Sequence, residues 1–351
     1  YRSQPAFAED PQALLEDGAV YPQRGQFGRY VAQRFAEEAR ASAGRLTHLR
    51  EQALSIHHGE VVTDSGRRLS ADLLVLAISH PPPSLPTLTM PFATHPALIA
   101  NPWRVSVLEA IAPEASVAIV GTGLTMADTV ATLTRLGHRG PITAFSRRGL
   151  LSRSNLSGSG DPWPGEYDRG SLRQRLRQIR EDIARAEQQG LAWQVVMDAV
   201  RNQGQRIWQG LTVADRQRFL RHLRSYWDVH RYRIAPQVAG VIEQRQRDGS
   251  LRVLAARLTA LEGDAQRLTL TLALRYGEAQ RVSADHVILT TGPAHGALTD
   301  SQPLLRQLSQ DGLIRADAFG LGLDVDLRSR AIGREGQANP KLLVSGPAAR
   351  A

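Results

Sequence analysis

Two glycines at the end of an apolar run are the residues of this chain best suited to hold a phosphorylated ligand. Gly121 and Gly123 follow the run directly, and a helical pattern begins at Leu124. Gly121 would permit a tight turn, and Gly123 would let a diphosphate approach the backbone. We expect the backbone of Thr122, Leu124 and Thr125 to complete the contact, because a helix start offers free N–H groups and a favourable dipole. This turn predicts dinucleotide binding; the alternative is an ordinary glycine turn.

The end of the next predicted strand indicates which dinucleotide binds. An NAD site places an acidic residue about 20 residues beyond the glycines, where it binds the ribose hydroxyls. This chain instead has Ser146, Arg147 and Arg148 in that region. One hydroxyl and two guanidiniums suit the 2′-phosphate of NADP(H). We therefore expect NADP(H), the alternative being two arginines that only face solvent.

Three local elements must position these residues. The apolar run Val117–Val120 predicts a parallel strand that is covered on both faces. Residues 124–136 predict a helix, and residues 142–145 predict a second strand. Met126 stands where the dinucleotide pattern usually has its third glycine, so we expect a wider approach of helix to strand or a different tilt.

Two further segments share one pattern. SADLLVLAISHPPP (70–83) and SADHVILTTGPAHG (283–296) each run from Ala-Asp through an apolar strand into a turn of small residues. Each follows a β-rich stretch, 54–69 and 251–282 respectively. Two related dinucleotide-binding domains would produce this repeat, with small residues where the chain passes close to the nucleotide. Further candidate cofactor contacts are Ser79, His80, Thr291 and Gly292.

A helix-rich insertion is predicted at about 171–245, because apolar residues recur there at three- and four-residue steps. Its segment RFLRHLRSYWDVHRYRIAP (218–236) is both aromatic and basic, which leaves three interpretations open. It could bind nucleic acid, it could line a pocket with basic side chains, or it could pack its aromatic residues on the core. The pocket set would be Arg221, His222, Arg224, His230 and Arg231, and the packing set Phe219, Leu223, Tyr226 and Trp227.

Composition excludes several classes of site. The chain has no cysteine, so disulfides, thiolate zinc sites and the dithiol relay of some flavin enzymes are excluded. Lys341 is the only lysine among 43 cationic residues, and the arginines that make up the +9 charge are scattered among acids. We therefore expect no nucleic-acid partner. We also expect no metal site, because His222 and His230 have only Asp228 nearby as a third ligand. No segment reaches the roughly 18 apolar residues of a membrane span, which favours the cytoplasm.

Taken in order, the motifs resemble bacterial FAD-NAD(P)-binding proteins that are distantly related to flavin-containing and N-hydroxylating monooxygenases. The motifs are YPQRGQFGRYV (21–31), LAISHPPP (76–83), NPW (101–103), VGTGLTMAD (120–128), FSRRGL (145–150), the segment 218–236, TTGPAH (290–295) and GLGLDVD (320–326). The resemblance implies an α/β fold of two Rossmann-like domains, with an NAD(P) domain inserted into an FAD domain. It assigns 1–105 to the first part of the FAD-type domain, 106–292 to the NAD(P) domain and 293–351 to the return segment.

The resemblance also implies a function and shows a departure from the pattern. Such proteins open with a glycine-rich FAD motif that is not seen in this sequence, and Ser79 stands where glycine is usual. The sequence is therefore expected to be a fragment or to lack the N-terminal FAD unit. The expected function is an NADPH-reduced FAD oxidoreductase, extending to a monooxygenase on a small amine or amino acid. The alternative is a nucleotide-binding or redox-sensing module without turnover; no catalytic acid or base is predicted.

Overall fold

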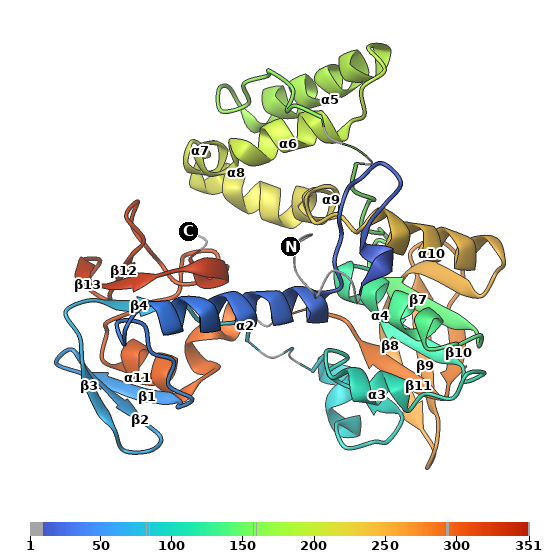
Figure 1. The fold of residues 1–351 in the computed structure, drawn as a ribbon. Coiled ribbons are helices and arrows are strands. Elements are labelled where there is room, and N and C mark those ends of the chain that lie inside the picture. The colour runs from blue at the N-terminus through green and yellow to red at the C-terminus, as the bar shows by residue number, and fades with distance from the viewer. Residues whose placement is uncertain are drawn as a thin grey trace. The chain divides into compact units, whose positions relative to one another are not determined.

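The computed structural model describes residues 10–81, 83, 85–156, 158, 160–292 and 295–349 (Figure 1). The chain divides into two compact units. The first unit comprises Tyr1–Arg45 and Leu85–Thr290, and the second comprises Leu46–Ser84 and Thr291–Ala351. Among the described residues, every helix is too short or too polar to cross a bilayer.

The first unit contains a seven-stranded sheet in the order β10-β9-β8-β7-β6-β11-β5. Its strands are β5 (Leu98–Ile99), β6 (Val117–Val120), β7 (Ile142–Ser146), β8 (Leu251–Gly263), β9 (Leu268–Leu274), β10 (Gln280–Ala284) and β11 (His286–Leu289). Strands β5, β11, β6, β7 and β8 run parallel, and β9 and β10 extend the sheet in antiparallel pairs. The strands predicted at 117–120 and 142–145 and the β-rich stretch 251–282 are confirmed, as is the α/β class.

Helix α4 (Leu124–Arg135) confirms the helix predicted after the glycines and packs on this sheet. Met126 is only 1% exposed and lies in the same core cluster as Ile119, Val130 and Ile142. Full burial of such a side chain contributes about 1.5–3 kcal/mol. The position of the missing third glycine is thus a core position in this chain.

The predicted helix-rich insertion is confirmed and has its own apolar cluster. The first unit's other helices are α2 (Arg24–Ala41), α3 (Val105–Glu109), α5 (Leu172–Gln188), α6 (Gln194–Asn202), α7 (Gly204–Gln209), α8 (Val213–Arg218), a π-helical turn (Phe219–Leu223), α9 (Arg224–Arg231) and α10 (Pro236–Arg247). Trp227 joins the apolar cluster, as the packing interpretation expects, but Tyr226 is 44% exposed. The π-helical turn changes which residues after it face the core, so the α-helical spacing assumed for Tyr226 was wrong.

A buried tyrosine–aspartate hydrogen bond joins the irregular segment before α5 to that helix. The Tyr167 hydroxyl donates to Asp182 at 2.8 Å, and both residues are at most 1% exposed. Replacing Tyr167 with phenylalanine leaves a buried carboxylate short of a donor, so we expect a loss of about 1–3 kcal/mol in the free energy of unfolding. Urea unfolding measures this, with Tyr276→Phe as the control because Tyr276 is 80% exposed. Equal effects of the two substitutions would contradict the structural role.

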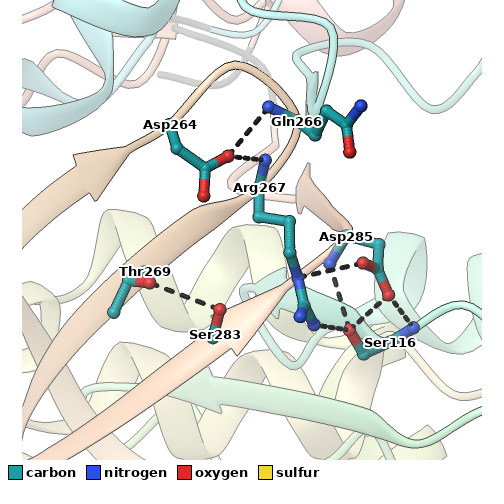
Figure 2. Close-up of polar contacts among 7 residues, drawn as sticks. All are labelled: Ser116, Asp264, Gln266, Arg267, Thr269, Ser283 and Asp285. Atoms are coloured by element: carbon teal, nitrogen blue, oxygen red, sulfur yellow. Dashed lines mark hydrogen bonds and ion pairs between the residues drawn. The ribbon is translucent and has the colours of Figure 1, made fainter.

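At the amino ends of β6 and β11, a polar cluster links these two strands to the turn between β8 and β9 (Figure 2). The Ser116 N–H and hydroxyl both donate to one oxygen of Asp285 at 2.7 Å. Arg267 lies 3.0 Å from the other oxygen of that carboxylate. The Ser116 hydrogen bonds, with a further contribution from Arg267, hold the pKa of Asp285 below its usual value. Because this cluster lies before the strands begin, it is at the opposite edge from the glycine turn.

Two histidines near this cluster predict a pH-dependent stability. Burial lowers the pKa of His138 and of His286. In the unfolded chain both titrate near pH ~6.5, so below that pH the unfolded state binds more protons. The stabilisation that depends on these two histidines being neutral is therefore fully present above about pH 6.5 and is lost as the pH falls below that value. Thermal unfolding across this range measures the loss, and a His138→Gln/His286→Gln variant should show a flatter profile; an unchanged slope would contradict the assignment.

The described residues of the second unit form two small sheets and one α-helix. Its elements are β1 (Ala53–His57), β2 (Glu60–Thr63), β3 (Arg68–Ser70), β4 (Leu74–Leu76), α11 (Pro303–Gln310), β12 (Arg330–Ile332) and β13 (Ala338–Val344). Strands β1, β2 and β3 form an antiparallel meander, which confirms the β-rich stretch 54–69. Strand β4 runs parallel to β13. The Gln307 side chain accepts the Ile56 N–H at 2.9 Å and donates to the Ile56 carbonyl at 3.1 Å, so α11 is tied to β1.

Candidate nucleotide-binding site

The turn after β6 accepts only glycine at its first position. Gly121 has φ +117°, and a Cβ built there would lie 2.6 Å from the Thr290 hydroxyl oxygen and 2.8 Å from its carbonyl oxygen. Thr290 is held in this position because its N–H and hydroxyl both donate to the Val120 carbonyl, at 2.9 and 3.0 Å. Gly121 therefore permits two neighbouring parallel strands to end in close contact.

The second glycine leaves space at the start of α4. Gly123 is exposed, and apart from its chain neighbours and its own helix, no described atom lies within 4 Å of a Cβ built on it. No side chain of the described residues caps the helix. The first N–H groups of a helix lack partners within it, so those of Leu124 and Thr125 are suited to bind an anion.

The hydroxyls of Thr122 and Ser146 brace the loop that follows β7. Thr122 is buried, and its hydroxyl donates to the Leu150 carbonyl at 2.6 Å. It also lies 2.8 Å from the Ser146 hydroxyl, which accepts the Gly149 N–H at 3.0 Å. These contacts place the end of β7 beside the glycine turn. The sequence identified both residues as cofactor contacts but did not indicate this bracing role.

The two arginines after β7 have different surroundings. Arg147 is exposed and makes no hydrogen bond or ion pair within the described part of the chain. The Arg148 guanidinium lies over the Tyr226 ring at 5.0 Å and donates to the His222 carbonyl at 3.1 Å. Arg147 is therefore available to a ligand, whereas Arg148 joins the β7 loop to the helical insertion.

A contact that sequence reasoning missed lies in the second turn of α4. Arg24, at the start of α2, donates to the Asp128 carboxylate at 3.1 Å. Burial raises the pKa of Asp128, and Arg24 partly offsets this shift. The arginine thus balances the negative charge that Asp128 would otherwise place near a bound phosphate. A lone arginine so far away in the sequence carried no signal of this pairing.

The other candidate cofactor residues lie in the second unit. Ser79 and His80 are exposed and follow β4, and Thr291 is exposed after β11. Gly292 has φ +81°, and apart from its chain neighbours no described residue lies within 4 Å of a Cβ built on it. The structure thus brings the residues from Gly121 to Arg148 together within the first unit, while these four form a separate set.

The chain is similar to known proteins in part of its sequence and in its fold. The FAD-NAD(P)-binding family matches residues 1–81, and no curated protein matches the sequence. The fold is similar to ornithine hydroxylase from Pseudomonas aeruginosa, with 17% identity, a TM-score of 0.56, and coverage of 94% of this chain and 70% of that one. L-lysine 6-monooxygenase from Pseudomonas syringae has 17% identity and a TM-score of 0.55, and the match covers 91% of this chain and 74% of that one. Ornithine N-hydroxylase from Kutzneria sp. 744 has 15% identity and a TM-score of 0.54, and the match covers 93% of this chain and 71% of that one. The predicted two-domain flavoprotein fold is confirmed.

Proposed function

We propose that this protein is an NADPH-dependent FAD oxidoreductase whose NADP(H) diphosphate lies on the turn from Gly121 to Thr125. The observation that carries the proposal concerns the described residues: none of them caps the start of α4, none fills the space above Gly123, and none pairs with Arg147 at the end of the adjacent strand. Helix-start amides and a guanidinium are donors that suit phosphate groups. Arg147 would hold the 2′-phosphate, and Arg148 would keep the loop in place through Tyr226.

FAD is the second proposed cofactor. The support is the FAD-NAD(P)-binding match over residues 1–81 and the Kutzneria enzyme, which was solved with reduced FAD, NADP+ and L-ornithine. We assign 106–292 to the NAD(P) domain and 1–105 with 293–351 to the FAD-type domain. Candidate FAD contacts are Ser79, His80, Thr291 and Gly292. When bound, NADPH supplies a hydride to reduce the flavin.

A small amine or amino acid is the proposed substrate class, and oxygen the proposed electron acceptor. The support is the similarity of the fold to enzymes described as lysine and ornithine monooxygenases. The residues of this chain would bind and orient the two cofactors, while the cofactors supply the redox chemistry. A cytoplasmic location belongs to the same proposal.

An absorbance spectrum tests this function directly. The purified chain is mixed with FAD, freed of unbound flavin, and recorded before and after NADPH is added without oxygen. We expect retained yellow flavin that NADPH bleaches, with NADH much less effective. A chain that retains no FAD would contradict the flavoprotein assignment. Binding of both nucleotides without bleaching would favour a sensing module instead.

A further inference from the structure

A polar pocket of about 390 Å³ lies within the first unit, where four segments of the chain meet. Tyr21 lines it from the segment before α2, and Asn155 from the irregular segment after β7. Asp198 and Arg201 line it from α6, and Arg233 from the connection between α9 and α10. Its volume is within the range of small-molecule sites. None of the residues that line it belongs to the glycine turn.

A buried arginine lines this pocket with an unused donor. The Arg233 side chain is 8% exposed and forms an ion pair with Asp198 through Nη2. Its other terminal nitrogen, Nη1, is buried and has no hydrogen-bond partner among the described residues. A buried charged donor without an acceptor is costly. An anion bound in the pocket would lie beside this buried positive charge, so the arginine is suited to a ligand.

The other walls of the pocket are held in place and add positive charge. The Asn155 side-chain amide donates to the Tyr21 hydroxyl at 2.9 Å, which in turn donates to the Leu156 carbonyl at 3.1 Å. Arg201 is exposed near the end of α6 and makes no ion pair within the described residues. Two guanidiniums and one carboxylate therefore line the pocket, and the excess positive charge favours an anion.

We propose that this pocket binds the oxyanion group of a small molecule, a carboxylate or a phosphate, between Arg233 and Arg201. The Asp198 carboxylate holds the buried guanidinium in place at the wall of the pocket. Asn155 and Tyr21 form a wall that is already ordered before the ligand enters. Planar guanidinium groups are well matched to both kinds of oxyanion.

Titration of the whole chain with inorganic phosphate, and separately with acetate, tests the proposal by calorimetry at constant ionic strength. We expect saturable binding of at least one anion. The anion that binds more tightly indicates whether the ligand's oxyanion group is a phosphate or a carboxylate. Arg201→Gln should weaken this binding about tenfold, which is about 1.4 kcal/mol. The control is Arg180→Gln, an exposed arginine of α5 with no ion pair among the described residues. Equal affinities of these two variants would overturn the proposal.

Phosphate could also bind at the start of α4, and a further variant separates the two sites. Arg147→Gln should leave pocket binding unchanged; loss of binding in this variant alone would place the anion at the glycine turn and overturn the proposal. Because Arg233→Met alone would leave Asp198 unpaired, it is combined with Asp198→Asn, and folding is checked by circular dichroism. This double variant should lose at least tenfold in affinity. Absence of saturable binding for both anions in the unmodified chain would also overturn the proposal, without bearing on NADPH or FAD.

Discussion

Gly121→Ala is expected to abolish NADPH binding and to lower the free energy of unfolding by about 1–3 kcal/mol. The added methyl would lie 2.6 Å from the Thr290 hydroxyl oxygen and 2.8 Å from its carbonyl oxygen. The carbonyl is backbone, so the turn must move, and φ +117° is itself strained for alanine. Moving the turn displaces the amides that would bind the diphosphate. Urea unfolding and NADPH titration by fluorescence measure the two effects.

Gly123→Ala is the matched control, because its methyl meets no described residue beyond its chain neighbours and its own helix. Its φ of −89° is also ordinary for alanine. We expect almost no change in stability but weaker NADPH binding, since the methyl would occupy the space of the diphosphate. If Gly123→Ala leaves NADPH affinity intact, the diphosphate does not lie on this turn.

Arg147→Ala is expected to weaken NADPH binding by about 10- to 100-fold and to leave NADH binding nearly unchanged. The reason is that charge-assisted hydrogen bonds contribute about 1.5–3 kcal/mol each, and only NADPH has a 2′-phosphate. Arg147 is exposed and has no partner within the described part of the chain, so its removal should not affect folding. Dissociation constants for both nucleotides measure the difference.

Arg148→Ala provides the comparison within the same loop. Arg148 is already engaged with Tyr226 and the His222 carbonyl. We expect Arg148→Ala to weaken NADPH binding by less than Arg147→Ala does. We also expect it to loosen the π-helical turn, which amide hydrogen exchange detects. Equal weakening of NADPH and NADH by Arg147→Ala would refute the 2′-phosphate assignment, whatever Arg148→Ala does.

Much of the fold around the site could be predicted from local patterns. The apolar run of β6, the two glycines and the helical spacing of α4 are contiguous in the chain, and each element formed where it was expected. The meander of β1, β2 and β3 was also visible as a β-rich stretch. Which residues of α9 face the core could not be predicted in the same way. The π-helical turn before α9 interrupts the α-helical spacing on which that prediction depended.

The sequence by itself determined the order of strand, glycine turn, helix and strand, since hydrophobic periodicity and backbone freedom are properties of neighbouring residues. Only the tertiary structure decided which side chains meet. Thr290 contacts Gly121, the Arg148 guanidinium lies over the Tyr226 ring, and Arg233 lines the same pocket as Asn155 and Tyr21. These contacts join residues far apart in the chain, and their directions depend on how the strands and helices pack. For that reason the two arginines after β7 look alike in sequence but differ in their surroundings.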